Sequence, residues 1–452
     1  MEPAGPSEVN VQLKFIESSH GGEILIRGGY RYHHKRCNKS GTSVWTCARS
    51  ICKGSVVLDG NHSKIIRETY HSCVPDFESI DIEQSLIDLK KKVSTDYRPI
   101  PQIWKEEMAK YMSEPYADKL PSFYQNRDCL YKHRRAQWAK VNVQSCDDVQ
   151  LPEELAKDFL CTNKGGILIF ITPDSQNNLK NIENFFMDGT FKITPKPYVQ
   201  LYTVHGDIGS DLEFTKMVPF FFVLLPNKKQ RTYEMMFQSI KELVPNFNPK
   251  NVKVDFELAA KNALQIVFPS TKITGCYFHF SKAVWTNAGE FGICNSRDGC
   301  IYVRKCVQLA HLPNSKIMEG WFGLQAKAPA INNIGTFNEY LEGQWFTFKN
   351  IDLLSCYNHR HRTTNVVEGW HSKLNKTIRN DLNLLHFIWT LKEEAISQDF
   401  KFSQHELNHD VYRKRARKYI EIDKKIQRIV NAMLVGDITL DRCIDKLSYL
   451  KY

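Results

Sequence analysis

The stretch Asn184-Phe185-Phe186-Met187-Asp188-Gly189-Thr190-Phe191 is an apolar segment that delivers a carboxylate. A second segment, Asn251-Val252-Lys253-Val254-Asp255, has the same form. A carboxylate on a buried strand is costly unless its charge meets a metal or another partner. The two segments therefore predict strands whose aspartates could share divalent metal ions. Two structural alternatives stay open: Asp188-Gly189 is a common turn dipeptide, and Asp255 could cap a helix that begins near Leu258.

The segments around these aspartates alternate between strand and helix signals. Helical spacing occurs at residues 233–244 and 258–267, and strand-like segments occur at 166–171, 184–188, 198–205, 216–225, 251–255 and 271–280. Three strands close together, then helix, strand, helix and strand, is the element order of a ribonuclease-H-like α/β core. In that order an antiparallel meander is continued by parallel strands, and we expect this arrangement here.

Glu368 is the candidate for a third metal ligand. It lies in the first turn of an expected helix, one face of which is marked by Val366, Trp370, Leu374 and Ile378. Carboxylates are hard oxygen ligands that suit Mg²⁺ or Mn²⁺. Two such ions can activate a water or 3′-hydroxyl and stabilise the leaving oxygen of a phosphoryl transfer. Asn365 and Glu368 also fit a capping box, which is the structural alternative.

Four residues of metal-ligating type occur near the N-terminus, where residues 20–73 show the short alternating segments of an antiparallel β-sheet. A unit of about 55 residues has a small hydrophobic core, and a structural metal would stabilise it. Tetrahedral zinc takes its ligands as two close pairs joined by a loop. The spacing C-x4-C-x18-H-x-C fits this requirement, at Cys47, Cys52, His71 and Cys73. The alternative is two buried cysteines beside an unrelated His-Cys pair.

Basic residues are concentrated in the same segment. Residues 19–73 contain nine Lys and Arg against three Asp and Glu. One hairpin carries the candidates for contacts with DNA phosphates or bases: Arg31, Lys35, Arg36 and Lys39. A basic surface that only faces solvent is the alternative.

This N-terminal segment resembles a FLYWCH zinc finger, on the residues Leu25, Tyr30, Trp45-Thr46-Cys47, Cys52 and His71-x-Cys73. The usual end of that motif is His-x-His, and Cys73 replaces the second histidine by another valid zinc ligand. Such fingers resemble WRKY-type domains, which insert a β-sheet edge into the major groove. The resemblance implies structural Zn²⁺ and double-stranded DNA as a partner.

Four motifs occur in order in the central part of the chain: Asp188-Gly189-Thr190-Phe191, Asp255-x-Glu257-x-Ala259, Cys276-Tyr277-Phe278-His279 and Thr364-Asn365-x-x-Glu368. Together they look like a MULE-type (Mutator-like) transposase domain, over about residues 165–390. The separations of 67 and 113 residues between the acids fit a DDE core with a helical insertion before the last acid. The resemblance implies that Asp188, Asp255 and Glu368 are catalytic ligands of Mg²⁺ or Mn²⁺.

The role of Cys276 and His279 stays open at this point. They could supply half a zinc site, and the further ligands would come from Cys294, Cys300 or Cys306. They could equally orient the DNA or pack beside Asp255.

The expected fold is α+β and multidomain. We expect a FLYWCH-type zinc finger at residues 15–75, formed by a small zinc-stapled antiparallel β domain, and a helical linker at 76–160 that could form a helix-turn-helix. A ribonuclease-H-like MULE transposase domain with a helical insertion follows at 165–390. A basic helical C-terminal region covers 391–452 and includes the run Arg413–Lys418.

Composition narrows the class of protein. The 452 residues carry 61 Lys and Arg against 50 Asp and Glu, and this net charge of +11 favours a polyanionic partner. Thirteen cysteines form an odd set in a chain whose start has no export signal, so a disulfide framework is not expected. The longest apolar run, residues 217–225, is too short to span a bilayer. We therefore expect an intracellular, soluble protein of the nucleus, without a membrane partner.

The leading hypothesis is a transposase-like DNA-binding protein, in which the finger recognises DNA ends and the DDE core cleaves and transfers strands with Mg²⁺. It could act as a homo-oligomer on DNA. The alternative is a domesticated, non-catalytic DNA-binding or transcription regulatory protein, and a third option is a ribonuclease-H-like nuclease that acts alone. Intact acids are necessary for strand transfer but do not by themselves separate these functions.

Overall fold

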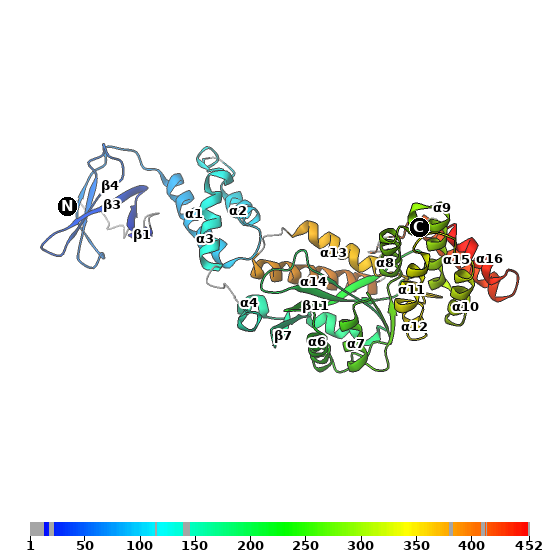
Figure 1. Ribbon diagram of the computed structural model, residues 1–452. Helices are drawn as coiled ribbons and strands as arrows, with labels where there is room; N and C mark the ends of the chain where they lie inside the picture. Colours follow the sequence, from blue (N-terminus) through cyan, green and yellow to red (C-terminus); the bar gives the residue numbers. More distant parts are fainter. Residues whose placement is uncertain are drawn as a thin grey trace, which may run out of the picture. The chain divides into compact units, whose positions relative to one another are not determined.

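The computed structural model describes residues 13–17, 22–113, 115–138, 145–378, 383–407, 412 and 414–450 of the chain. The chain divides into two compact units, residues 1–142 and 143–452 (Figure 1). The first unit contains an antiparallel sheet followed by helices, and the second contains a mixed sheet and the other helices. The domain boundaries expected from the sequence remain predictions.

The first unit begins with an antiparallel sheet in which each strand pairs with the next. Its strands are Lys14–Glu17 (β1), Glu23–Arg27 (β2), Tyr30–Cys37 (β3), Ser43–Cys47 (β4), Ser55–Leu58 (β5) and Ile65–Thr69 (β6). Gly28 and Gly29 connect β2 to β3 with φ values of 56° and 79°, a conformation that glycine adopts without steric cost. A small core lies at the centre of the sheet, made by Leu25, Tyr32, Trp45, Val56 and Leu58. The predicted antiparallel sheet is confirmed.

Three helices complete the described part of this unit: Phe77–Thr95 (α1), Ile100–Met108 (α2) and Phe123–Trp138 (α3). They share a core in which Leu89, Trp104 and Leu130 are buried. Arg134, in the basic run of α3, is buried and donates to the carbonyl oxygens of Val93 (2.9 Å) and Asp96 (2.8 Å). Its guanidinium therefore satisfies carbonyls at the end of α1 instead of facing solvent. A helix-turn-helix role for these helices stays a prediction.

The second unit is built on a seven-stranded mixed sheet with the order β13-β12-β9-β10-β11-β8-β7. Its strands are Leu160–Lys164 (β7), Ile167–Phe170 (β8), Asn184–Thr190 (β9), Gln200–Asp207 (β10), Met217–Leu225 (β11), Asn251–Val254 (β12) and Lys272–Gly275 (β13). β9, β10 and β11 form an antiparallel meander, and β12 and β13 continue it in parallel on the other side of β9. This is the arrangement of strands that the element order predicts.

The turn alternative for Asp188-Gly189 is wrong, because both residues lie inside β9. Asp188 pairs with Thr203 and Gly189 pairs with Tyr202 in the ladder to β10. A Cβ atom at Gly189 would lie 1.6 Å from Nε2 of Gln200. Glycine is therefore required here for the close approach of the Gln200 side chain, and not for a turn.

Helices cover both faces of this sheet (Figure 1). Gln230–Leu243 (α6) and Leu258–Val267 (α7) share a core with Phe185 and Met187 of β9. On the other side, Val367 of Asn365–Thr377 (α13) packs on Phe186, and Leu384–Glu406 (α14) contacts β11. Successive side chains of a strand point to opposite faces, so Asp188 lies on the same face as Phe186, under α13.

The strand predicted at 271–280 is correct only in its first half. The parallel ladder between β12 and β13 ends at Gly275, and the helix Tyr277–Glu290 (α8) begins two residues later. The backbone N–H of Phe280 donates to the carbonyl oxygen of Cys276 at 3.1 Å, which is the first turn of that helix. Cys276 is therefore a helix N-cap residue, and His279 lies in the first turn of α8.

The expected helical insertion lies between β13 and α13. After α8 it contains Arg297–Gln308 (α9), Asn314–Gln325 (α10), Ile334–Gln344 (α11) and Ile351–Leu354 (α12). Its core also includes Val430 of Arg417–Leu434 (α15) and Ile444 of Leu440–Ser448 (α16). The last two helices therefore pack with the insertion.

Short elements complete the description. Two further α-helices are Glu153–Ala156 (α4) and Pro173–Asn178 (α5). Single 3₁₀ turns occur at Ala109–Tyr111, Ala117–Lys119, Cys146–Asp148, Leu179–Asn181, Ile293–Asn295 and Leu309–His311. Among the described residues, no helix combines the length and the apolar character that crossing a bilayer requires.

Candidate functional site

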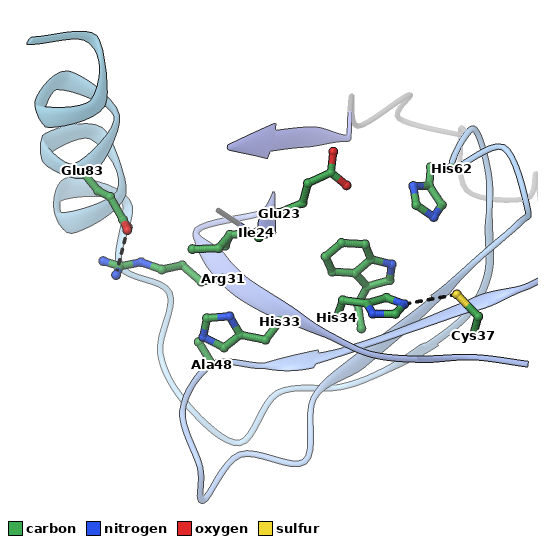
Figure 2. A pocket seen from close by; sticks show the side chains of 11 residues that line it. Glu23, Ile24, Arg31, His33, His34, Cys37, Ala48, His62 and Glu83 are labelled. Carbon is green, nitrogen blue, oxygen red and sulfur yellow. Dashed lines mark hydrogen bonds and ion pairs between the residues drawn. The ribbon is translucent and has the colours of Figure 1, made fainter. Parts of the chain in front are cut away.

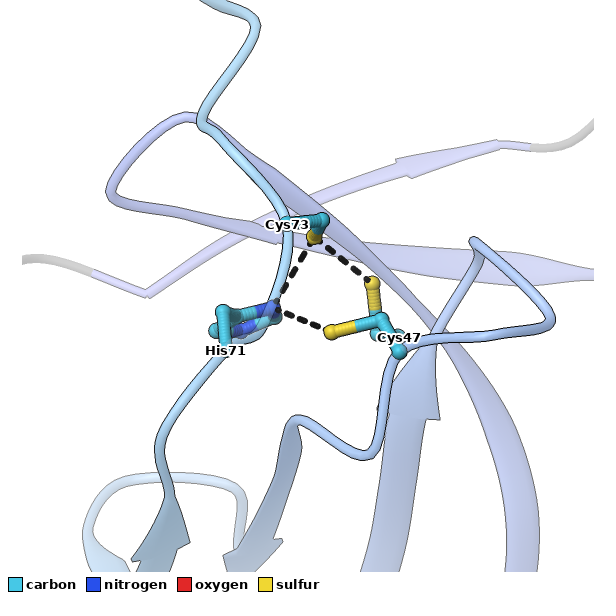
Figure 3. Close-up of side chains that lie close together, drawn as sticks. Cys47, His71 and Cys73 are labelled. Atoms are coloured by element: carbon cyan, nitrogen blue, oxygen red, sulfur yellow. Dashed lines mark hydrogen bonds between the residues drawn. The ribbon is translucent and has the colours of Figure 1, made fainter.

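The four residues of the proposed zinc site come together at one end of the N-terminal sheet (Figure 3). Cys47 ends β4, Cys52 lies in the loop that follows, and His71 and Cys73 come after β6. Their ligand atoms all lie within 4.8 Å of one another. Cys47 Sγ is 3.8 Å from Cys73 Sγ, and His71 Nδ1 is 3.4 Å from Cys52 Sγ and 3.6 Å from Cys73 Sγ.

These separations fit a tetrahedral zinc ion. Zn–S bonds of roughly 2.3 Å and Zn–N bonds of roughly 2.0 Å at tetrahedral angles place two sulfurs about 3.8 Å apart and a sulfur and a nitrogen about 3.6 Å apart. The alternative of two buried cysteines beside an unrelated His-Cys pair does not account for four ligand atoms that face one point. The residues present therefore fit structural zinc.

Neighbouring groups orient the His71 ring. Its Nε2 is 2.7 Å from the hydroxyl of Tyr32, so with zinc on Nδ1 the ring donates through Nε2 to a buried tyrosine. The ring also stacks on Tyr30, with centroids 3.6 Å apart and an interplanar angle of 10°. A Cβ atom at Gly54 would lie 2.5 Å from His71 Nδ1, so a larger residue would displace the ring. The sequence pattern alone does not identify Tyr32 or Gly54 as parts of this site.

Backbone amides stabilise the thiolate form of one cysteine of the cluster. Burial opposes ionisation of Cys52, but the N–H groups of Gly54 and Ser72 point at its sulfur, each at 3.4 Å, and lower the pKa of this thiol to about 5. Burial, together with the neighbouring Cys52 and Cys47, raises the pKa of Cys73 to about 11. A metal cation would stabilise the deprotonated form of these cysteines, because only thiolates bind it.

The four candidate DNA-contact residues differ in their surroundings. Arg31 forms an ion pair with Glu83 of α1 at 3.0 Å (Figure 2). Lys35, Arg36 and Lys39 are exposed, and none of the three forms an ion pair with another described residue. The register of β3 on β4 shifts between His34 and Arg36, so Lys35 sits at a β-bulge. We therefore retain three free cations and one that is engaged within the unit.

β3 also provides a partly free strand edge. Its pairing with β2 ends at His33, while its pairing with β4 continues to Cys37. Beside this edge lies a cavity of about 700 Å³ whose lining includes Arg31, His33 and His34 (Figure 2). His34 Nε2 lies 3.4 Å from Cys37 Sγ, and both side chains are exposed. The exposed basic side chains of β3 and its unpaired edge therefore occur on the same strand.

In the second unit, Asp188 lies in β9, and Asp255 directly follows the neighbouring strand β12. β12 runs parallel to β9, and Lys253 is in register with Phe186. Asp188 lies two residues further along β9, and Asp255 lies one residue beyond the end of β12. Asp188 is buried, and burial together with the charge of Asp255 raises the pKa of its carboxyl to about 7. The nearby Asp255 is half-buried, and its Oδ1 accepts a hydrogen bond from the Glu257 N–H at 3.1 Å.

The helix-cap alternative for Asp255 is wrong, because Asp255 is not the N-cap residue of α7. The N-cap residue of α7 is Glu257, and no side-chain cap hydrogen bond is formed there. Glu257 itself accepts a hydrogen bond from Tyr233 at 2.9 Å and pairs with Lys228 at 3.6 Å. Asp255 is therefore available for a second role.

Glu368 lies in the first turn of α13, as predicted. The capping-box alternative is wrong, because the N-cap residue is Thr364 and Asn365 is already helical. The charge of Glu368 further raises the pKa of Asp188, so the three carboxylates act on one another electrostatically. The imidazole of His279 lies 3.4 Å from Oε1 of Glu368. Among the described residues, the three carboxylates do not form a group of metal-ligating side chains as close as the Cys/His cluster.

Cys276 connects α8 to α13. Its buried sulfur accepts hydrogen bonds from the backbone N–H and the hydroxyl of Thr364, both at 3.3 Å. Burial opposes ionisation, but the hydrogen bonds from His279 and Thr364 lower the pKa of this thiol. The hydrogen bond to Cys276 raises the pKa of His279 to about 9. The pair therefore holds the start of the glutamate-bearing helix against α8.

The alternative of a second zinc site at these residues finds no support in the described residues. Cys276 and His279 do not belong to any group of three or more metal-ligating side chains. Cys306 is fully buried, and burial raises the pKa of its thiol. The thiol of Cys300 donates to the carbonyl oxygen of Cys294 at 3.2 Å.

His371 lies next to the candidate acids and was not predicted from the sequence. It lies one turn after Glu368 on α13, with Nδ1 3.8 Å from Oδ2 of Asp188 and Nε2 2.9 Å from the hydroxyl of Thr203. Burial lowers the pKa of His371 to about 4, so the ring is neutral at pH 7 and does not compensate the charge of Asp188. The spacing Glu368-x-x-His371 places both on one helix face, which is the signal that could have found it.

The carboxylates are short of compensating hydrogen-bond donors. Asp188 accepts one hydrogen bond, from the Gly189 N–H at 2.8 Å. Oε1 of Glu368 is shielded from solvent and accepts no hydrogen bond from a described residue. Surroundings that are rich in acids and poor in hydrogen-bond donors fit a divalent cation held by oxygen ligands, because the ion adds positive charge to that of His279.

Comparison with protein families finds two matches in the chain. Residues 15–72 match the FLYWCH zinc finger domain, and residues 185–283 match the MULE transposase domain. The chain joins a FLYWCH zinc finger to a MULE transposase domain. No curated protein matches the chain.

These matches cover most of the candidate site residues. The FLYWCH match includes Cys47, Cys52 and His71, and it ends one residue before Cys73. The MULE match includes Asp188, Asp255 and the Cys276–His279 motif, and Glu368 lies beyond it. A zinc finger and a transposase domain in one chain indicate a transposase-like, metal-binding and DNA-binding protein.

Proposed function

We propose that this protein is a DDE transposase that cleaves and transfers DNA strands with Mg²⁺ or Mn²⁺. Asp188, Asp255 and Glu368 are its catalytic metal ligands. The observation that carries the proposal is the parallel pairing of β12 with β9, because Asp188 lies in β9 and Asp255 directly follows β12, while the helix that bears Glu368 packs on β9. The strand order and directions of β9 to β13 support a ribonuclease-H-like core for this domain.

The residues around the acids have distinct roles in this proposal. Asp188, Asp255 and Glu368 would hold the divalent cations, and these would supply the charge that polarises the scissile phosphate and activates a water or 3′-hydroxyl. His279 is positively charged at neutral pH and lies beside Glu368, where it limits repulsion among the acids. Cys276 is a positioning residue, because it fixes Thr364 at the start of α13.

The finger recognises double-stranded DNA at the ends of the transposable element. Lys35, Arg36 and Lys39 contact phosphates or bases, and the unpaired edge of β3 enters the major groove. Zn²⁺ is structural and holds the ends of β4 and β6 together. Strand transfer requires two DNA ends, so the protein acts in the nucleus as a homo-oligomer on DNA.

The test compares three full-length proteins on the same DNA. Duplexes bound by the wild type are selected from a random pool and then incubated with Mn²⁺ and the wild type, Asp188→Asn or Asp298→Asn. Asp298 is an exposed carboxylate of α9 and serves as the matched control. We expect the wild type and Asp298→Asn to cleave, and Asp188→Asn to be slower by on the order of a thousand-fold.

The outcomes separate the alternative functions. Cleavage followed by joining supports the transposase, and hydrolysis without joining supports a nuclease. Equal inactivity of all three proteins, with DNA binding kept, would overturn the catalytic proposal in favour of a domesticated DNA-binding regulator.

A further inference from the structure

A cavity of about 500 Å³ lies in the second unit beside the candidate acids. It is lined by the first turns of α8 and α13, by residues 360–363 and by the start of α15. The same turn of α8 that presents His279 to Glu368 presents Phe278 to this cavity. Its size is within the roughly 300–1,000 Å³ of small-molecule pockets.

The lining of the cavity is basic. Among the described residues, the lining contains Arg360, Arg362 and Arg415 and no Asp or Glu. Asp423, which is not part of the lining, pairs with Arg362 and with Arg415. Arg360 donates to the backbone oxygens of Asp211 and Phe214, while its Nη1 is shielded from solvent and has no hydrogen-bond partner among the described residues.

Two helix N-termini add to the positive potential. Tyr277 and Phe278 begin α8, and Asn365 and Val366 begin α13, and all four line the cavity. The amide groups at a helix N-terminus attract anions, and phosphates bind there. Burial and the nearby charge of Arg415 lower the pKa of Arg360, although the charges of Asp423, Asp207 and Asp211 act in the opposite direction.

Aromatic side chains give the cavity a second binding property. Phe278 is 40% exposed and Tyr419 is 50% exposed, which is unusual for large rings that line a hollow. Exposed aromatic faces stack with nucleobases irrespective of base identity. The combination of arginines, helix N-termini and free rings matches the two parts of a nucleotide, a phosphate and a base.

We propose that this cavity, the flank pocket, binds one unstacked nucleotide of the DNA strand next to the scissile phosphate. Its phosphate lies against Arg360 and the start of α13, and its base stacks on Phe278 and Tyr419. The position next to the scissile phosphate rests on the proposed function, because the first turn of α13, which lines the pocket, also carries Glu368. Nucleotide binding by the pocket does not itself require catalysis.

The experiment measures binding of the full-length protein to a DNA hairpin with a short single-stranded overhang, without added Mg²⁺ or Mn²⁺. The overhang carries one 2-aminopurine, whose fluorescence falls when it stacks on an aromatic ring. We expect fluorescence quenching by the wild type, and weaker overhang binding by Phe278→Ala, Tyr419→Ala and Arg360→Gln, each by about ten-fold. The controls are Phe322→Ala and Arg297→Gln, at an exposed ring of α10 and an exposed arginine of α9 outside the pocket.

A second probe separates a nucleotide site from a simple anion site. An overhang with an abasic residue in place of 2-aminopurine should remain sensitive to Arg360→Gln and become insensitive to Phe278→Ala. If Phe278→Ala and Tyr419→Ala bind both overhangs as the wild type does, the nucleotide proposal is overturned. Displacement of both overhangs by inorganic phosphate alone, with no effect of the base, would likewise leave only an anion site.

The result is independent of the catalytic test. If the wild type cleaves DNA but the pocket variants bind the overhang normally, the flank pocket proposal fails and the transposase proposal stands. If the wild type does not cleave and the pocket variants lose quenching, the catalytic proposal fails and a nucleotide site remains. Thermal unfolding of each variant shows whether it is folded, and exposed rings such as Phe278 are replaced with little effect on stability.

Discussion

Cys276 shows how one side chain can position a site without taking part in its chemistry. Its sulfur accepts two hydrogen bonds from Thr364, at the start of the helix that carries Glu368, and it pairs with His279. A buried donor that loses its acceptor costs about 1–3 kcal/mol. The geometry of Glu368 therefore depends on a residue that lies on a different helix.

We expect Cys276→Ala to destabilise the second unit by about 1–3 kcal/mol and to slow DNA cleavage, because Thr364 loses its acceptor. Chemical denaturation measures the first effect and the Mn²⁺ assay measures the second. Cys443→Ala is the matched control, since Cys443 is equally buried and makes one long contact of 3.9 Å to the Ile429 carbonyl oxygen. An equal loss of stability and activity in both variants would reduce the role of Cys276 to packing.

The residues of the zinc site could be read from their types and spacing, whereas the residues that support them could not. Cys47, Cys52, His71 and Cys73 have few alternatives in a small β unit. Tyr32 looks like an ordinary strand residue until the fold brings its hydroxyl to His71. His371 was missed for a similar reason, because its neighbour Asp188 is distant in the sequence.

At the scale of elements, β3 is the strand whose exposed basic side chains and unpaired edge indicate DNA binding. Its last residues pair with β4 alone, and the bulge at Lys35 changes the local twist. Lys35, Arg36 and Lys39 have no ion-pair partner among the described residues, in contrast to Arg31. Each phosphate contact releases bound counterions, so its loss lowers the salt dependence of binding.

Neutralising these three residues together, as Lys35→Gln, Arg36→Gln and Lys39→Gln, should weaken DNA binding and reduce the slope of log K against log salt by up to about 2.7. Fluorescence anisotropy at several salt concentrations measures the slope. The control protein carries Lys91→Gln, Lys105→Gln and Arg127→Gln, three exposed cations of α1, α2 and α3. If the control loses the slope and the β3 variant keeps it, the helices and not the sheet bind DNA.

Element types were predictable from the sequence where hydrophobic spacing was strong, as for α7 at 258–267. The segment 271–280 was misread beyond Gly275, because an apolar run does not distinguish a buried strand from a buried helix. Asp188-Gly189 was open to a turn interpretation because only the fold reveals the Gln200 side chain beside Gly189. Pairing between strands supplies information that local sequence lacks.

At the scale of the whole molecule, the metal site belongs to one compact unit and the acids belong to the other. The finger core is small, with Trp45 among its few buried large side chains. Structural zinc supplies much of the folding free energy of such units. The mixed sheet of the second unit has a larger core and does not share the zinc ligands.

Removal of zinc from the full-length protein with a chelator should therefore unfold the sheet of residues 23–69 and leave the second unit folded. Hydrogen exchange measures both in one sample: peptides from β2 to β6 should lose protection, and peptides from β9 to β12 should keep it. Cys52→Ala, measured without chelator, should reproduce the pattern. Retained protection in the finger after zinc loss would show that its core suffices without the metal.

The packing of α15 and α16 into the core of the insertion has a consequence for synthesis on the ribosome. Val430 and Ile444 complete a cluster that also includes Trp321, which emerges more than a hundred residues earlier. The central sheet and α13 can fold while translation continues. The apolar core of the insertion, in contrast, stays partly exposed to solvent until α16 has left the exit tunnel. A stop codon placed before Leu440 would therefore leave nascent chains that chaperones retain, however complete their acids and zinc ligands are.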